Sequence, residues 1–156
     1  KQIKKSEGVK IVVDTNIVFS AILNANSRIA QILIYESPQF QFYSCGYLQT
    51  EILKHREKLL KITRLAESEL IELENFITHN ITFINDHLLP ELLVKETQKQ
   101  LQNIDPFDVP FVALAKHLNA QLWTGDKKLY KPLKEQGFEN IITTPEMAIL
   151  IDGFEL

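Results

Sequence analysis

The chain has 156 residues, of which 45% are hydrophobic and 24% are charged, which is the composition of an ordinary globular protein large enough for one domain with a hydrophobic core. Its single cysteine, Cys45, excludes an intrachain disulfide and a metal centre built from several thiolates. A net charge of −3 argues against a protein that holds nucleic acid by bulk positive charge, although divalent cations can bridge an acidic protein to phosphate.

No stretch of the sequence reaches the roughly 18 uninterrupted apolar residues that a membrane-spanning helix needs. The longest candidate, residues 9–23, contains Asp14 and Asn16. The N-terminus is basic but lacks the apolar core and small-residue cleavage site of a secretory signal. We therefore expect a cytoplasmic protein without a membrane segment.

Short apolar runs alternate with longer amphipathic segments along the chain. The short runs predict strands at residues 9–13, 40–43, 81–84, 120–124 and 140–143. The amphipathic segments predict helices at residues 16–23, 27–36, 47–60, 63–78, 91–101, 108–118 and 127–136, with a last helical turn after Pro145. This alternation is typical of a three-layer α/β/α sandwich around a mainly parallel sheet of four to five strands. We expect residues 1–8 to form a flexible tail and residues 9–156 to form a single domain.

Aspartates stand at the ends of the most strand-like segments. Asp14 directly follows the first strand, and Asp126 follows the fourth by two residues. Asp108 opens the helix that leads into the fourth strand, and a helix N-terminus favours a carboxylate. Parallel sheets bind ligands at the carboxyl ends of their strands, and buried carboxylates are costly unless they are paired, hydrogen-bonded or bound to a cation. The pattern therefore predicts a metal site for phosphate chemistry.

Each of these acidic residues also has a simpler interpretation. Asp14 can cap the following helix, Asp105 and Asp108 can be turn or capping residues, and Asp126 can belong to a plain turn with Gly125. Glu51 lies on the margin of an apolar helix face, where an exposed glutamate is common. The conjunction of these residues is more informative than any one of them.

The same residues resemble the signature of PIN domains. The resemblance rests on Asp14-Thr15-Asn16 after the first strand, a glutamate in an early helix, and Thr124-Gly125-Asp126 after a later strand. Its most specific parts run from Asp105 to Ala115 and from Leu122 to Leu129, and the match extends from about residue 9 to residue 150. The chain is similar to small prokaryotic PIN proteins, many of which are VapC-type toxins of toxin–antitoxin pairs.

This resemblance implies a metal-dependent endoribonuclease. Its catalytic and metal-binding set would be Asp14, Glu51, Asp108 and Asp126, with Asp105 as an additional candidate ligand. Asn16 and Thr124 would hold the carboxylates or a metal-bound water in place, and the candidates for RNA contact are Lys127, Lys128, His55 and Arg56. Hard oxygen ligands suit Mg²⁺ or Mn²⁺. The implied partners are RNA, a cognate antitoxin, and a second copy of the chain bound through the early helices.

Two other functions are consistent with parts of the sequence. A phosphotransferase of the haloacid-dehalogenase type also has an aspartate after its first strand, but it requires a second aspartate at position 16, which is Asn. A non-catalytic PIN-like module that binds RNA or protein would keep the fold without turnover.

Overall fold

The structure is a computed structural model of the chain, and it describes residues 8–35 and 37–155. Apart from Gly8, the expected tail of residues 1–8 lies outside these residues. The described residues form a five-stranded, all-parallel sheet in the order β3-β2-β1-β4-β5. Its strands are β1 (Val9–Val13), β2 (Phe40–Cys45), β3 (Ile81–Ile84), β4 (Gln121–Trp123) and β5 (Ile141–Ile142).

Helices connect these strands. The α-helices are α1 (Thr15–Leu23), α2 (Arg28–Ile34), α3 (Gly46–Lys54), α4 (Arg56–Thr63), α5 (Glu67–Thr78), α6 (Glu91–Leu101), α7 (Val109–Leu118), α8 (Lys127–Glu135) and α9 (Thr144–Glu155). Two short 3-10 helices are η2 (Asp86–Leu88) and η3 (Pro106–Asp108). The predicted α/β sandwich with a parallel sheet is therefore confirmed.

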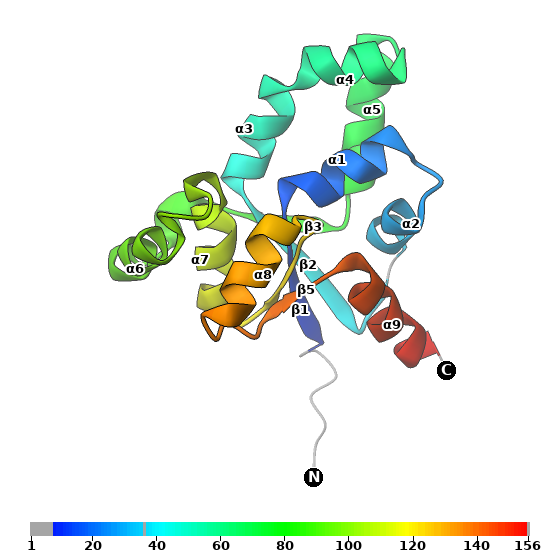
Figure 1. The fold of residues 1–156 in the computed structure, drawn as a ribbon. Coiled ribbons are helices and arrows are strands. Elements are labelled where there is room, and N and C mark those ends of the chain that lie inside the picture. Colours follow the sequence, from blue (N-terminus) through cyan, green and yellow to red (C-terminus); the bar gives the residue numbers. More distant parts are fainter. Residues whose placement is uncertain (1–7, 36, 156) are drawn as a thin grey trace.

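The helices cover both faces of the sheet (Figure 1). On one face α7 packs against β1, β2 and β4, α6 packs on α7, and α8 packs on β5. On the other face α1, α2 and α5 pack together, and α9 packs on α2. Because both faces are covered, the second half of β1 can be continuously apolar, and Ile11, Val12 and Val13 are fully buried.

Helices α3 and α4 extend beyond the carboxyl edge of the sheet (Figure 1). The prediction of one helix at residues 47–60 was wrong, because the chain leaves helical geometry at His55, with φ −102° and ψ 14°. The change of direction lets Arg56 at the start of α4 form an ion pair with Glu74 of α5, with 2.6 Å between Nη2 and Oε1.

Other boundaries differ from the prediction for local reasons. Helix α5 begins at Glu67 rather than residue 63, because Arg64 takes a left-handed conformation with φ 59° and ends α4. The predicted helix from Asp108 begins as the 3-10 turn η3, and α7 itself starts at Val109. The helix predicted at residues 27–36 spans Arg28–Ile34 and is capped by Ser27, while residue 36 lies outside the described residues.

Among the described residues, no single helix is long and apolar enough to cross a membrane. Helices α1 and α2 meet the criteria of length and composition only as a pair that is bent by 108°.

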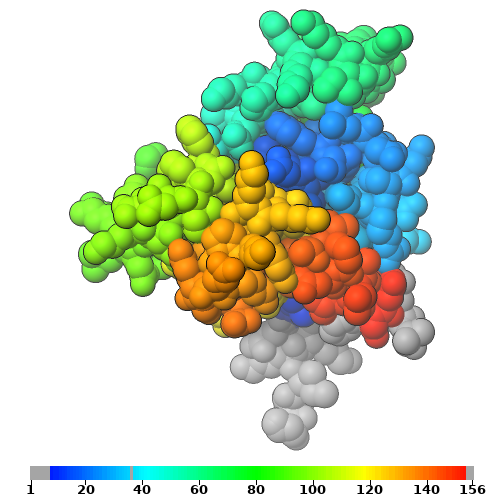
Figure 2. Space-filling model, in the orientation of Figure 1, coloured from blue at the N-terminus to red at the C-terminus, as the bar shows by residue number. Residues whose placement is uncertain are grey.

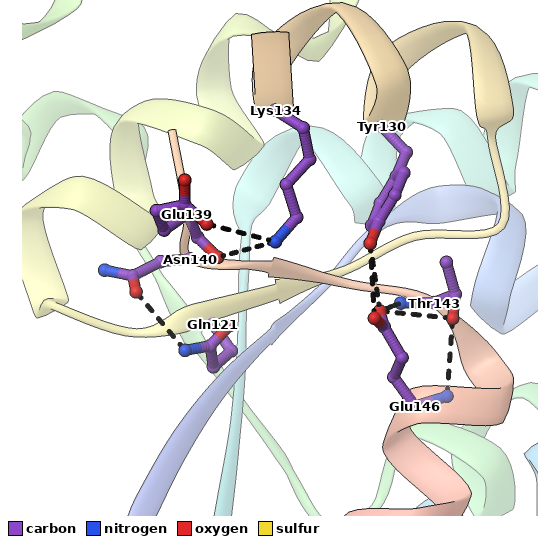
Figure 3. Close-up of polar contacts among 7 residues, drawn as sticks. All are labelled: Gln121, Tyr130, Lys134, Glu139, Asn140, Thr143 and Glu146. Carbon is purple, nitrogen blue, oxygen red and sulfur yellow. Dashed lines mark hydrogen bonds and ion pairs between the residues drawn. The ribbon is translucent and has the colours of Figure 1, made fainter. Parts of the chain in front are cut away.

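The C-terminal helix α9 is far longer than the single turn expected after Pro145, and a capping box fixes its start (Figure 3). The Thr143 amide donates to Glu146 Oε1 at 2.8 Å, and the Glu146 amide donates to Thr143 Oγ1 at 3.3 Å. The Tyr130 hydroxyl of α8 donates to the same carboxylate at 3.2 Å. These bonds tie α8 to α9 beside the edge strand β5.

Glu146→Ala should therefore lower the free energy of unfolding by about 1 kcal/mol at neutral pH, the usual cost of a lost cap. The Thr143 amide holds the pKa of this carboxyl below its ordinary value. The contribution of Glu146 is thus complete above an ordinary pKa of 4.5 and is lost as the pH falls through the folded-state pKa. Urea denaturation at neutral and acidic pH measures the loss. Glu139→Ala, which breaks an exposed ion pair with Lys134, is the control and should change little; an equal loss in the Glu139 variant would contradict the cap.

Candidate functional site

A cleft of about 290 Å³ opens at the carboxyl edge of the sheet. It brings together all five expected acidic residues: Asp14, Glu51, Asp105, Asp108 and Asp126. The other side chains that line it are Thr15, Asn16, Phe19, Tyr47, Lys54, His55 and Phe107. In Figure 2 the segments that border the cleft lie next to one another, namely the blue start of α1, the teal α3, the yellow-green η3 and the gold start of α8.

Asp14 lies at the end of the central strand and is only 2% exposed. Its Oδ1 accepts a hydrogen bond from the Ile17 amide at 3.1 Å, so it does cap α1. Burial raises the pKa of Asp14 to about 6, against the lowering effect of hydrogen bonds that include one with the Thr124 side chain. The capping role and a place in the cleft are therefore compatible, because capping engages only one carboxylate oxygen.

Three aspartates converge most closely. Asp105, Asp108 and Asp126 each present an oxygen within 4.8 Å of the others. Asp105 also accepts from the Phe107 amide at 3.0 Å, and Asp126 accepts from the Lys128 amide at 2.9 Å. Asp108 differs, since its buried Oδ2 has no hydrogen-bond partner among the described residues.

The electrostatics of Asp108 follow from this arrangement. Burial raises the pKa of Asp108 to about 7, and the negative charges of Asp105, Asp14, Asp126 and Glu51 add to the effect. A buried carboxylate oxygen without a partner is costly, and a cation would remove both the repulsion and the missing contact. The donors are hard oxygens, so they fit Mg²⁺ or Mn²⁺.

Glu51 reaches the cleft from α3 and is held there by Thr15. The Thr15 hydroxyl donates to Glu51 Oε1 at 2.5 Å across 36 positions of sequence. Burial and the nearby Glu51 raise the pKa of the Tyr47 phenol. Sequence reasoning gave no role to Thr15 or Tyr47, and the only available signal for Thr15 was its place directly after Asp14.

The two polar residues expected to support the carboxylates lie in different settings. Thr124 is buried, and its Oγ1 accepts from the Asp126 amide at 3.0 Å, so it shapes the turn that carries this aspartate. Asn16 is exposed and lines the cleft.

Of the four candidates for RNA contact, three lie at or beside the cleft and one does not. His55 lines the cleft and packs edge-to-face on Phe19, with 5.6 Å between ring centroids. Lys127 and Lys128 are exposed at the start of α8, next to Asp126. Arg56 does not line the cleft, because its guanidinium is paired with the buried Glu74. Lys54, which sequence reasoning did not select, lines the cleft in its place.

Comparison with known proteins identifies the family. A family model described as "PIN domain" matches residues 12–144. The chain belongs to the PIN domain family. PIN domains are nucleases and typically bind divalent metal through acidic residues, and the cluster of three aspartates agrees with this.

Solved structures with the same fold include two toxin–antitoxin complexes. A chain in the crystal structure of VapBC2 from Rickettsia felis, bound to a DNA fragment from their promoter, gives a TM-score of 0.65 at 15% identity, over 86% of this PIN domain chain and 97% of that chain. A chain of a toxin–antitoxin complex from Klebsiella pneumoniae gives 0.54 at 17% identity, over 85% and 96%. At these identities the likeness shows the shared fold. A search of curated proteins gave no significant match.

Asp108→Asn should make the metal-free protein more stable at mildly alkaline pH, by about 1–2 kcal/mol after allowance for solvent screening. A carboxyl with a raised folded-state pKa contributes its stability below the ordinary value of 3.8 and loses it as the pH rises through about 7. The gain over wild type should therefore vanish near an acidic pH of about 4. Thermal denaturation in EDTA at both pH values measures it, with the exposed Asp152→Asn as control. A destabilised Asp108→Asn at alkaline pH would contradict the repulsion.

Proposed function

We propose that this PIN domain is a divalent-metal-dependent endoribonuclease and that it acts as a VapC-like toxin. The observation that carries the proposal is the convergence of five carboxylates in one cleft, around a buried Asp108 oxygen that lacks a hydrogen-bond partner. If these carboxylates served only to stabilise the fold, we would expect basic side chains to form ion pairs with them. Here only one cation, Lys54, lines the cleft among the described residues.

The residues have distinct parts in this proposal. Asp105, Asp108 and Asp126 would hold Mg²⁺ or Mn²⁺, with Asp14 and Glu51 completing the acidic set. When bound, such an ion supplies positive charge at the phosphate and lowers the pKa of a coordinated water. The Thr15 hydroxyl fixes the rotamer of Glu51, and the Thr124 hydroxyl fixes the turn of Asp126. Asn16 and the Lys54 ammonium border the same space and can contact the phosphate or a metal-bound water.

The acidic cleft also constrains how RNA is recognised. A polyanion is repelled by five carboxylates, so binding at the cleft depends on the cation, and flanking positive charge must hold the rest of the strand. Lys54, Lys127 and Lys128 supply that charge beside the cleft, and His55 offers a further donor.

The toxin role adds partners to the proposal. The two solved complexes with this fold each pair a toxin with an antitoxin, and we extend this arrangement to a cognate antitoxin that covers the cleft. A second copy of the chain, joined through the early helices, and a cytoplasmic location belong to the same proposal. The family match gives no support to the haloacid-dehalogenase alternative.

Incubation with total RNA tests the activity. We expect cleavage that requires Mg²⁺ or Mn²⁺ and is lost, by at least about 100-fold, in Asp14→Asn and in Asp108→Asn. In a separate measurement, millimolar Mn²⁺ should raise the melting temperature of the wild type but not of Asp108→Asn.

In the cleavage assay, mapping the new RNA ends separates specific cleavage from contamination. Cleavage that survives unchanged in the Asp14→Asn protein would sink the assignment, and metal binding without cleavage would favour a non-catalytic module.

Thr15→Val tests the support of Glu51. The variant keeps the shape of the side chain and removes the hydroxyl that orients the carboxylate, so we expect metal affinity to fall about 10- to 100-fold. Titration of the melting temperature with Mn²⁺ gives the affinity. Thr50→Val, an exposed threonine of α3 outside the cleft, is the matched control. An unchanged Mn²⁺ titration in Thr15→Val would mean that Glu51 needs no such support.

A further inference from the structure

Phe107 lines the acidic cleft although it is an apolar side chain. It is 65% exposed and lies on η3, between Asp105 and Asp108 in the sequence. Exposure of a phenylalanine forgoes the free energy that its burial would contribute, and in this cleft the neighbouring groups are carboxylates. The ring is therefore accessible from the cleft to a ligand with an apolar face.

Hydrogen bonds order the turn that carries Phe107. Its amide donates to Asp105 Oδ1 at 3.0 Å, and the Asp108 amide donates to the Asp105 carbonyl at 3.1 Å. Pro106 fixes the first residue of the turn, and the Val109 amide donates to its carbonyl. The ring is thus presented by an ordered turn rather than by a frayed loop.

The other aromatic rings of the cleft already have partners. Phe19 packs edge-to-face on His55, and Tyr47 packs on the buried Phe111 with 6.3 Å between ring centroids. Among the described residues, Phe107 makes no such ring contact. Because the side chain is 65% exposed, most of its surface is open to a planar group.

We propose that Phe107 is a stacking platform for one nucleobase of the RNA, next to the phosphate held at the acidic cluster. The inference rests on the proposed function and adds a recognition element to it. A nucleotide joins a planar base to its phosphate, and the same short turn carries the ring together with Asp105 and Asp108, so one nucleotide can engage both. A base in a duplex has both faces covered by its neighbours, whereas an unpaired base can stack on an aromatic ring. The platform therefore selects an unpaired nucleotide at the cleft.

Oligonucleotide binding tests the platform without relying on cleavage. The probes are a fluorescent single-stranded RNA of mixed sequence, an abasic strand of the same length, and the corresponding duplex, measured by anisotropy with Ca²⁺ in place of Mn²⁺. Phe107→Ala should weaken binding of the single-stranded RNA by about five-fold or more, while Phe107→Tyr keeps a ring and should bind as the wild type does. Abasic and duplex probes should bind Phe107→Ala and wild type equally. Leu92→Ala, at a residue that is 81% exposed on α6, is the matched control and should change none of these affinities.

The possible failures are distinguishable. Equal binding of single-stranded RNA by wild type and Phe107→Ala would overturn the platform alone, and so would an equal loss on the abasic probe, because the ring would then act without a base. Retained RNA binding with loss of a protein partner would assign the ring to that partner instead. A wild type that binds neither the base-bearing nor the abasic strand would overturn the proposed function as well.

A folding control accompanies these measurements. Because Phe107 is exposed, the melting temperature of Phe107→Ala should match that of Leu92→Ala.

Discussion

The order of the strands gathers carboxylates at one edge of the sheet, and the repulsion among them is the constraint that governs the site. The chain adds strands outward from β1 to β3 and then returns to place β4 on the other side of β1. The connections diverge at the β1–β4 junction, where the Asp14 amide donates to the Trp123 carbonyl at 3.3 Å. Acidic residues that follow β1 and β4 must therefore meet. The fold offsets part of the cost with backbone amides, since Asp14, Asp105 and Asp126 each accept at least one hydrogen bond from an amide. The buried Oδ2 of Asp108 has no such partner among the described residues.

The parts of the fold that the sequence predicted are those set by local pattern. Continuous apolar runs identified the strands, and parallel pairing followed from their alternation with helices, so the edge that gathers Asp14 and Asp126 could be foreseen. The break at His55 could not be foreseen, because the Arg56–Glu74 ion pair that accompanies it joins residues far apart in the sequence. The bond from Thr15 to Glu51 is equally non-local. Asp105 was ambiguous because capping and proximity to the other aspartates are compatible roles, and the three-dimensional structure shows that it has both.

Some basic residues near the cleft form ion pairs within the fold, and others remain accessible at the cleft surface. Arg56 binds Glu74, which is 5% exposed, and joins α4 to α5 beyond the carboxyl edge of the sheet. Removing one member of such a buried pair leaves an uncompensated charge, so this arginine belongs to the scaffold that positions α3 and Glu51. Lys54, one turn from Glu51 on α3, remains at the cleft. Lys54 and Arg56 are thus close in the sequence but do not share one surface, and net charge alone says little about which basic residues would contact RNA in the proposed function.

Metal affinity, pH and folding should be coupled in this protein through the same groups. The raised pKa values of Asp14 and Asp108 mean that protons and divalent cations compete for the same carboxylates. Folding without metal therefore favours the protonated cleft, while a bound cation stabilises the fold only when the aspartates are ionised. Neutralising one carboxylate would reduce the repulsion in the metal-free protein, but it would also remove a candidate metal ligand. In the proposed function a cation offsets this cost of the acidic cleft, and the exposed Phe107 ring lines the same cleft.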